Sequence, residues 1–320
     1  MSGAASVERV KDRDIGLDKF VLREARGSSV EVYLYGGQVT FWKNNFGQQL
    51  LFVSNKLGNH GVLEQHGFAR NRFWSVDESP PPFPVATSNC HVDLILKSSP
   101  EDLKIWPHSY EFRLRVALTP RGDLILTSRI KNISSDSKPF QFTFAYHTYF
   151  SVSDISEVRV EGLETLDYLD NLQSKKRFTE QGDAVVFESE VDKVYLSAPP
   201  KVVIIDHEKK RTFVLRKEGL PDVVVWNPWD KKDEEYKSML CVGAAAIEKP
   251  VTLKPGEEWI GKQEISAVPS SYSSGQLDPE LIRRMHNIKF TRDCIDPTFQ
   301  TSLCFFFNSE AALGLESSPC

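Results

Sequence analysis

Hydrophobic residues recur at every second position through much of the chain. Over residues 110–118, large apolar side chains at the even positions alternate with Glu111, Arg113 and Arg115. This period of two is typical of a β-strand with one buried face. Further segments that read as strands lie at residues 29–35, 38–42, 124–133, 140–150, 202–205, 212–215, 222–226, 239–242 and 263–268.

Clusters of Gly, Pro, Asn, Asp and Ser separate these segments, and residues 25–268 contain no helical stripe of three turns. Gly36 and Gly37, between two of the strands, predict a hairpin turn. Many short strands punctuated by turns predict an all-β fold, a large antiparallel β-sandwich. We expect one domain over residues 15–270. The serines after residue 269 and the loss of periodicity predict a linker and irregular tail over residues 271–320, with a possible short helix at 277–287.

Composition narrows the functional classes. The 320 residues carry 39 Lys and Arg against 44 Asp and Glu, a formal net charge of −5. A mildly acidic chain argues against nucleic acid or an anionic membrane as the main partner. No run approaches the roughly 18 apolar residues of a membrane span. The five cysteines form no CxxC pair, and residues 1–16 lack the apolar core of a signal peptide. We therefore expect reduced thiols and a cytosolic location.

Familiar cofactor motifs are missing from the sequence. It contains no phosphate-binding glycine loop, no HExxH and no Cys/His zinc spacing, which disfavours a nucleotide or metal enzyme. His147 is the most informative histidine. If residues 140–150 form one strand, Phe140, Phe142, Phe144 and Tyr146 share one face and His147 lies on the other. There water can reach the imidazole, which suits a proton donor near neutral pH. A histidine that only caps the backbone at the surface accounts for this alternating pattern at least as well.

Other polar residues also have two readings. Gln65, His66 and Arg70 lie within six residues, and Arg70 could bind an anionic oxygen bidentately. The plainer reading is a polar loop. Asp170 could accept hydrogen bonds from hydroxyl groups or could cap a turn. Trp226 offers an aromatic face for a sugar or a core side chain.

Four motifs in order resemble a known family: QHGFAR at 65–70, AYHTYF at 145–150, VVVWNPW at 223–229 and LKPGEEW at 253–259. They are similar to the glucose-6-phosphate 1-epimerases, especially the plant forms, of the galactose mutarotase-like group. The resemblance spans roughly residues 15–275. It implies an antiparallel β-sandwich with the sugar on a concave face, and interconversion of the α and β anomers of an aldohexose 6-phosphate. It implies neither cofactor nor metal, and a sugar phosphate as the only partner of a monomer.

The resemblance also implies roles for individual residues. His147 is the acid that protonates the ring oxygen, and His66 forms a hydrogen bond near that oxygen. Gln65 and Arg70 contact the substrate, and Asp170 holds its hydroxyl groups. Acid and base on opposite sides of C1 open the ring, the aldehyde rotates, and the ring closes on either face.

The sequence departs from the family where the base is expected. The family carries an acidic residue directly after Cys-Val, but Cys241 and Val242 are followed by Gly243. Glu248 is the nearest substitute, about 17 Å along an extended strand and on the opposite face. The family's Arg-Gly-Gly-Ile-Pro segment, with its substrate-binding Arg, is absent between Lys56 and Leu57. Two alternatives follow: a sugar-phosphate-binding protein with impaired turnover, or a mutarotase of unphosphorylated aldoses.

Overall fold

Strands dominate the architecture of the chain. A computed structural model describes residues 4–53, 67, 69–82, 90–135, 138–230 and 233–270. Within them the chain forms twenty β-strands in three antiparallel sheets. Helical structure there is limited to α1 (Asp102–Ile105) and the 3-10 turns η1 (Ala69–Asn71), η2 (Ile155–Glu157), η3 (Asn171–Gln173) and η4 (Asp233–Ser238). No described helix is long and apolar enough to cross a membrane.

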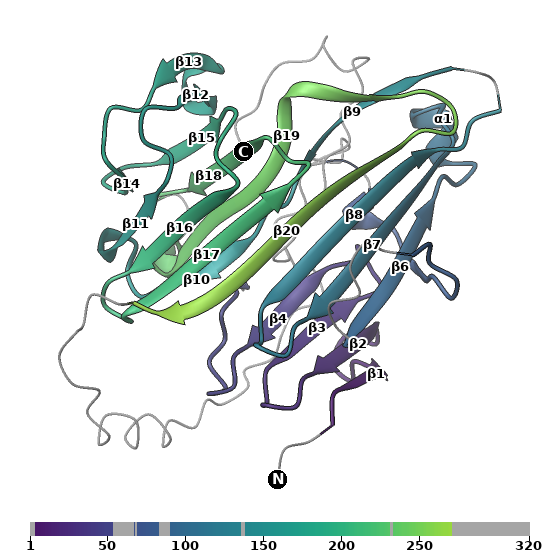
Figure 1. Ribbon diagram of the computed structural model, residues 1–320, viewed down its shortest axis with the longest axis horizontal. Helices are drawn as coiled ribbons and strands as arrows, with labels where there is room; N and C mark the ends of the chain where they lie inside the picture. The colour runs from purple at the N-terminus through teal and green to yellow at the C-terminus, as the bar shows by residue number, and fades with distance from the viewer. Residues whose placement is uncertain are drawn as a thin grey trace.

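The largest sheet has nine strands, in the order β14-β11-β16-β17-β20-β8-β7-β6-β5. Its long central strands run diagonally across Figure 1. The bounds are β5 (Ser75–Val76), β6 (His91–Lys97), β7 (Tyr110–Leu118), β8 (Leu124–Asn132), β11 (Val158–Glu161), β14 (Val185–Val186), β16 (Lys201–Asp206), β17 (Arg211–Glu218) and β20 (Glu258–Pro269).

The second sheet has seven strands. Its path is β10-β19-β18-β15-β12-β13, and β9 also pairs with β19. The bounds are β9 (Phe140–Ala145), β10 (Tyr149–Ser151), β12 (Asp167–Asp170), β13 (Lys176–Thr179), β15 (Val191–Tyr195), β18 (Asp222–Asn227) and β19 (Met239–Leu253). β9 and β10 follow one another along the same edge of β19, so the polar residues between them lie against a central strand.

A four-stranded N-terminal meander completes the fold, with strands β1 (Ser6–Lys11), β2 (Asp18–Arg23), β3 (Ser29–Tyr33) and β4 (Val39–Lys43). It lies beside β6 and β7 of the nine-stranded sheet. The predicted hairpin is present between β3 and β4. Gly36 and Gly37 have φ angles of 74° and 63°, a backbone region that glycine enters without steric cost.

The main core lies between the two large sheets. β7 buries Tyr110, Phe112 and Leu114 and turns its charged residues outward, as the alternation predicts. From the other sheet, Phe144 packs edge-on against Phe112, with ring centroids 6.1 Å apart. Burying a large aromatic side chain here is worth roughly 3 kcal/mol in transfer free energy. The two sheets therefore depend on each other for stability.

The predicted all-β sandwich is confirmed, and every segment predicted as a strand contains one. The segment 140–150 differs, because it forms β9 and β10 with residues 146–148 between them. Strand β1 begins at Ser6, before the expected domain start at residue 15. The predicted tail, residues 271–320, lies outside the described residues.

Candidate functional site

The seven-stranded sheet has a second face, turned away from the main core. Its buried apolar residues form two small clusters, one around Ala145, Val194 and Val224 and the other around Trp226 and Cys241. Because strand residues alternate between faces, every second residue of β15, β18 and β19 points to this side. We call this surface the second face.

His147 lies on the second face, directly opposite Gly243. Ala145 pairs with Ala245, and Tyr149 pairs with Cys241. Midway between these pairs the register brings His147 to Gly243, although residues 146–148 belong to neither strand. The acidic position of the resembling family, after Cys-Val, is therefore the cross-strand neighbour of the histidine.

The residues on either side of His147 are anchored in the main core. The Tyr146 hydroxyl donates to Ser128 Oγ at 2.8 Å on the nine-stranded sheet. Gln263 Nε2 donates to Thr148 Oγ1 at 2.8 Å, and Gln263 Oε1 accepts from the Ala244 backbone N–H at 2.8 Å. With both neighbours turned inward, the side chain between them is turned outward.

The environment of the imidazole differs from the expected one. His147 is only 7% exposed, so the prediction of a histidine that water readily reaches is wrong. Its Nδ1 lies 3.7 Å from Cys241 Sγ. Burial lowers the pKa of His147 to about 4, and the charge of Arg70 adds to this effect. The imidazole is therefore neutral at pH 7.

Arg70 is brought close to His147 from a distant part of the sequence. It lies in η1, whose segment is held against the β3–β4 hairpin. The Gly36 N–H donates to the Arg72 carbonyl at 2.7 Å, and the Trp74 N–H donates to the Leu34 carbonyl at 2.8 Å. A Cβ on Gly36 would come within 2.4 Å of the Arg70 carbonyl oxygen, so this contact requires glycine.

Gly243 is closed to any side chain. A Cβ built there would lie 1.4 Å from the carbonyl oxygen of Tyr146 and 2.6 Å from its carbon. Real Cβ atoms do not approach backbone so closely, and Gly in a strand interior often marks such an approach. The backbone before His147 thus occupies the space where an acidic side chain would begin.

Glu248 is directed elsewhere. It lies where the pairing of β19 with β9 shifts register between Ala246 and Val251. Its Oε1 accepts from Arg177 Nη1 at 3.1 Å, on the edge strand β13. Its backbone N–H donates to Oδ2 of Asp222, the first residue of β18, at 2.9 Å. The structure thus brings Arg70 and His147 together and pairs Glu248 with Arg177.

Asp170 has the geometry of a cap. Its Oδ1 accepts from the Leu172 N–H at 2.9 Å, at the start of η3, and its Oδ2 accepts from Gln173 Nε2 at 2.8 Å. Asp170 pairs with Lys193, which pairs with Val225, and these residues lie on the face toward the main core. Val194 and Val224 lie on the second face, so Asp170 is on the opposite side of the sheet from His147. Gln65 and His66, the other predicted substrate contacts, lie outside the described residues.

Asp192 was not among the predicted residues. It is 4% exposed and aligns in register with Trp226 of β18, which aligns with Cys241 of β19. All three therefore share the second face with His147. Asn171 Nδ2 donates to Asp192 Oδ1 at 2.7 Å. Residues 191–195 (VDKVY) do not alternate between apolar and polar side chains, so no local signal identifies this strand or its carboxylate.

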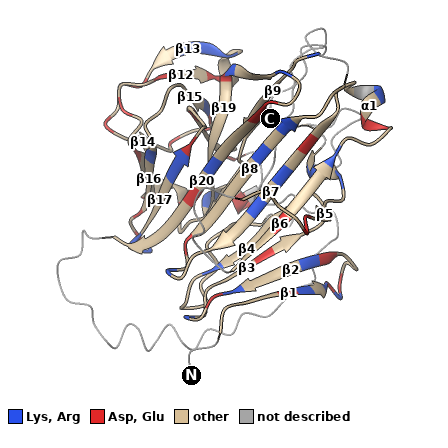
Figure 2. Cartoon of the chain, turned by 45° about the vertical axis from the view of Figure 1, so that its right-hand side comes forward, with Lys and Arg blue, Asp and Glu red and all other residues tan. Residues whose placement is uncertain are grey.

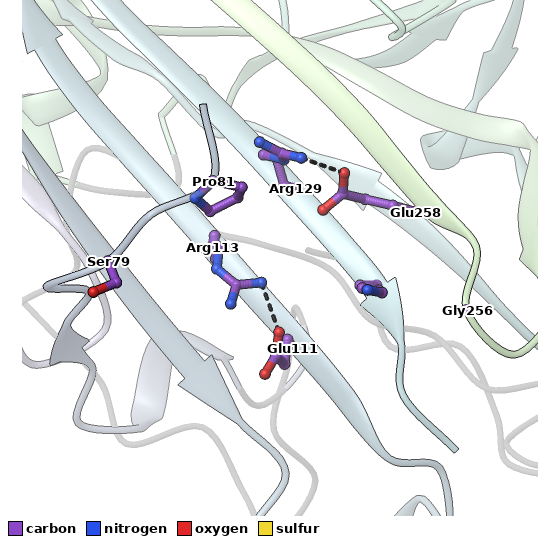
Figure 3. A pocket seen from close by; sticks show the side chains of 8 residues that line it. Ser79, Pro81, Glu111, Arg113, Arg129, Gly256 and Glu258 are labelled. Carbon is purple, nitrogen blue, oxygen red and sulfur yellow. Dashed lines mark hydrogen bonds and ion pairs between the residues drawn. The ribbon is translucent and has the colours of Figure 1, made fainter. Parts of the chain in front are cut away.

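A separate hollow lies on the outward face of the nine-stranded sheet. It has a volume of about 370 Å³ and includes Arg113, Glu111, Arg129 and Glu258 in its lining (Figure 3). Arg113 pairs with Glu111 at 2.6 Å, and Arg129 with Glu258 at 2.5 Å. Its charges come from β7, β8 and β20, whose inward faces form the main core, so it is not part of the second face. Across the described residues, no cluster of three metal-ligating side chains occurs.

The chain is similar to several known proteins. The family model described as aldose 1-epimerase matches residues 54–266. A protein of Cenchrus ciliaris named "Putative glucose-6-phosphate 1-epimerase" is 66% identical over 292 residues, covering 82% of this chain and 89% of that protein. A protein of the same name from Escherichia coli (strain K12) is 30% identical over 243 residues, covering 66% of this chain and 78% of its own.

Solved structures share the fold. The crystal structure of "a putative mutarotase" from Salmonella typhimurium superposes with a TM-score of 0.68 at 23% identity, covering 82% of this chain and 94% of its own. A galactose 1-epimerase from Lactobacillus acidophilus gives a TM-score of 0.62 at 13% identity, covering 83% and 99%. At these identities the likeness establishes the galactose mutarotase-like sandwich.

Proposed function

Because the chain belongs to the aldose 1-epimerase family, we propose that it interconverts the α and β anomers of glucose 6-phosphate. One observation carries this proposal: a buried histidine on the second face lies within the electrostatic reach of an arginine that is distant from it in sequence. The histidine supplies proton transfer and the arginine supplies recognition of an anionic oxygen. The 66% identity to a protein named for this substrate supports the choice of substrate.

His147 acts on the ring oxygen in this proposal. Its pKa of about 4 reflects burial first and Arg70 second. A phosphate bound by Arg70 cancels the second cause, so the pKa of His147 rises when substrate is present. The protonated imidazole then gives its proton to the ring oxygen while a carboxylate takes the proton of the C1 hydroxyl, which breaks the bond between C1 and the ring oxygen. The aldehyde rotates, and the reverse proton transfers close the ring on either face. The protons exchanged come from protein groups and water, and the reaction needs no cofactor.

The base is either of two carboxylates. Glu248, the predicted base, would have to leave Arg177. Asp192 is on the same face as His147 and lies three strand spacings away, across β18 and β19, which is about 14 Å between backbones. The two side chains reach toward each other over this span and leave room for a pyranose ring between them. We favour Asp192 as the group that contacts the C1 side of the sugar.

NMR exchange spectroscopy between the anomers of glucose 6-phosphate tests the proposal. His147→Ala should lower the catalysed rate by about 10²–10⁴, to the buffer background, because it removes the proton carrier. His207→Ala is the matched control, since His207 is exposed in the β16–β17 turn. Asp192→Asn and Glu248→Gln then identify the base. Equal rates for the wild type and His147→Ala would overturn the catalytic claim.

A second candidate rests on Gly243. Since the Tyr146 carbonyl fills the space of the family's acidic side chain, the chain could bind the sugar phosphate with little turnover. Calorimetric binding of glucose 6-phosphate together with an anomerisation rate at background identifies this case. Repeating the rate assay with free glucose and galactose tests the unphosphorylated alternative. We also propose that the protein is a cytosolic monomer. Size-exclusion chromatography tests the monomeric state.

A further inference from the structure

A cysteine and a histidine meet on the second face at hydrogen-bond distance. Cys241 Sγ and His147 Nδ1 are 3.7 Å apart, and both residues are buried, at 0% and 7% exposure. The register makes them diagonal cross-strand neighbours, two residues on from the His147–Gly243 pair. The contact is therefore fixed by the pairing of two strand edges whose backbones are anchored in the core.

We propose that Cys241 is a positioning residue that fixes the tautomer of His147: its S–H donates to Nδ1 and keeps the imidazole proton on Nε2. The consequence for catalysis rests on the proposed function, but the tautomer itself does not. A neutral imidazole has one N–H donor and one acceptor nitrogen, and its partner decides which nitrogen is which.

The direction of the hydrogen bond follows from the chemistry of the two groups. A thiol in apolar surroundings keeps its proton and is a weak donor, and sulfur is a weak acceptor. An unprotonated imidazole nitrogen is the stronger acceptor of the two atoms. Cys241 packs with Trp226 and Met239, which are apolar neighbours. The arrangement S–H to Nδ1 is therefore favoured over N–H to sulfur.

The other described cysteine behaves in the same way. Cys90 lies in a different cluster, with Sγ 3.4 Å from the Arg23 carbonyl oxygen and 3.7 Å from that of Ser6. A carbonyl only accepts, so there the thiol is the donor. Both buried thiols thus act as donors at similar distances, and Cys90 provides a matched control.

The tautomer decides which atom of His147 can serve the substrate. With the proton on Nε2, that nitrogen donates to the ring oxygen of a sugar. With the proton on Nδ1, the same atom presents a lone pair and the ring oxygen finds no donor. We expect Cys241→Ala to lower kcat about tenfold with KM within about twofold, because the chemical step loses its donor while substrate contacts remain.

The experiment uses the full chain with ¹⁵N-labelled histidine. Nitrogen chemical shifts at pH 7 distinguish the protonated from the unprotonated ring nitrogen, and His147→Gln assigns the signals. In the wild type we expect the proton on Nε2. Cys241→Ala and the bulkier Cys241→Val should shift the population toward Nδ1. Cys241→Ser, which retains a donor, and Cys90→Ala should keep the wild-type pattern.

Two results would overturn the proposal: a proton on Nδ1 in the wild type, or an unchanged pattern in both donor-free variants. The wild-type spectrum decides the first even if a variant does not fold. Failure of the proposed function can be told apart from failure of the tautomer proposal. In the former case the nitrogen shifts would follow the expected pattern, but the anomerisation rate would stay at the buffer background.

Discussion

The outward face of the nine-stranded sheet and the second face of the seven-stranded sheet both carry polar residues, but they use them differently. On the outward face, acidic and basic residues lie on neighbouring strands of the sheet, as the red and blue bands on β6, β7 and β8 in Figure 2 show. They neutralise one another there. Burial raises the pKa of Glu111, but hydrogen bonds from Lys97 and Arg113 outweigh this, so the pKa lies below its usual value.

The second face has few polar groups, and they are buried among apolar ones. His147 and Asp192 are 7% and 4% exposed. The pKa of His147 is moved by burial itself, with a cation adding to the effect. A perturbed titratable group in such a setting is a functional-site candidate, whereas paired surface charges are mostly structural. The hollow of Figure 3 therefore lies on the less reactive face.

The largest expected effect is a loss of stability at Gly243, where the second face has no room for a side chain. Gly243→Ala should lower the free energy of unfolding by at least about 3 kcal/mol, because its Cβ collides with the Tyr146 carbonyl. Urea denaturation measures the loss. Gly47→Ala is the matched control: its φ is 76° with no atom within 4 Å of the added Cβ, so it should lose only about 1 kcal/mol.

Gly243→Glu should behave like Gly243→Ala in stability and should gain no anomerisation activity. A Gly243→Ala protein as stable as the wild type would show that the Tyr146 backbone moves aside. In that case an acidic residue could be restored opposite His147, and Gly243→Glu would become the test of a missing base.

Features of the fold and site that depend on neighbouring residues could be predicted from the sequence. Features that depend on contacts between residues distant in the chain could not. The period of two in β7 is local, and it correctly gave the buried and outward residues. The break between β9 and β10 was not predicted, because it depends on the hydrogen bonds of Tyr146 and Thr148 to Ser128 and Gln263, which are 18 and 115 residues away in sequence. Parity placed His147 on the correct side of the strand. Its burial could not be predicted, since it depends on what packs against that side.

The candidate carboxylates show the same limit. The family resemblance predicts Asp170, and proximity to Gly243 along the chain predicts Glu248. Gln173 is only three residues from Asp170, so this cap agrees with the turn reading of the sequence, whereas Arg177, the partner of Glu248, lies 71 residues away in sequence. Asp192 joins the second face through register with two other strands, which sequence alternation alone does not supply.

A smaller effect is expected in the pH dependence of the free energy of unfolding, which tests whether the imidazole of His147 is buried. The unfolded chain binds a proton on His147 near pH 6.5, whereas the folded protein does so only near its lowered pKa of about 4. The stability contributed by the neutral histidine is thus complete above pH 6.5 and is lost as the pH falls toward 4. Between pH 7.5 and 5 the loss should be roughly 2 kcal/mol.

Urea unfolding at both pH values measures this loss as the difference between the wild type and His147→Gln, which does not titrate. His207→Gln, in an exposed turn, is the control and should follow the wild type. Identical pH dependence in the wild type and His147→Gln would mean that the imidazole is solvated, and the contrast between the two faces would lose its main support.

The smallest effect should come from the outward face. Arg113 pairs with Asp77 at 2.8 Å and with Glu111 at 2.6 Å in the hollow of Figure 3. Arg113→Ala should cost about 1 kcal/mol of stability, since ion pairs near the surface contribute little. It should leave kcat and KM for glucose 6-phosphate unchanged in the NMR exchange assay. Lys97→Ala, a more exposed partner of Glu111, should cost less still. A loss of turnover in Arg113→Ala with stability intact would place the substrate in this hollow, because only a bound ligand would make a paired surface arginine indispensable to the reaction.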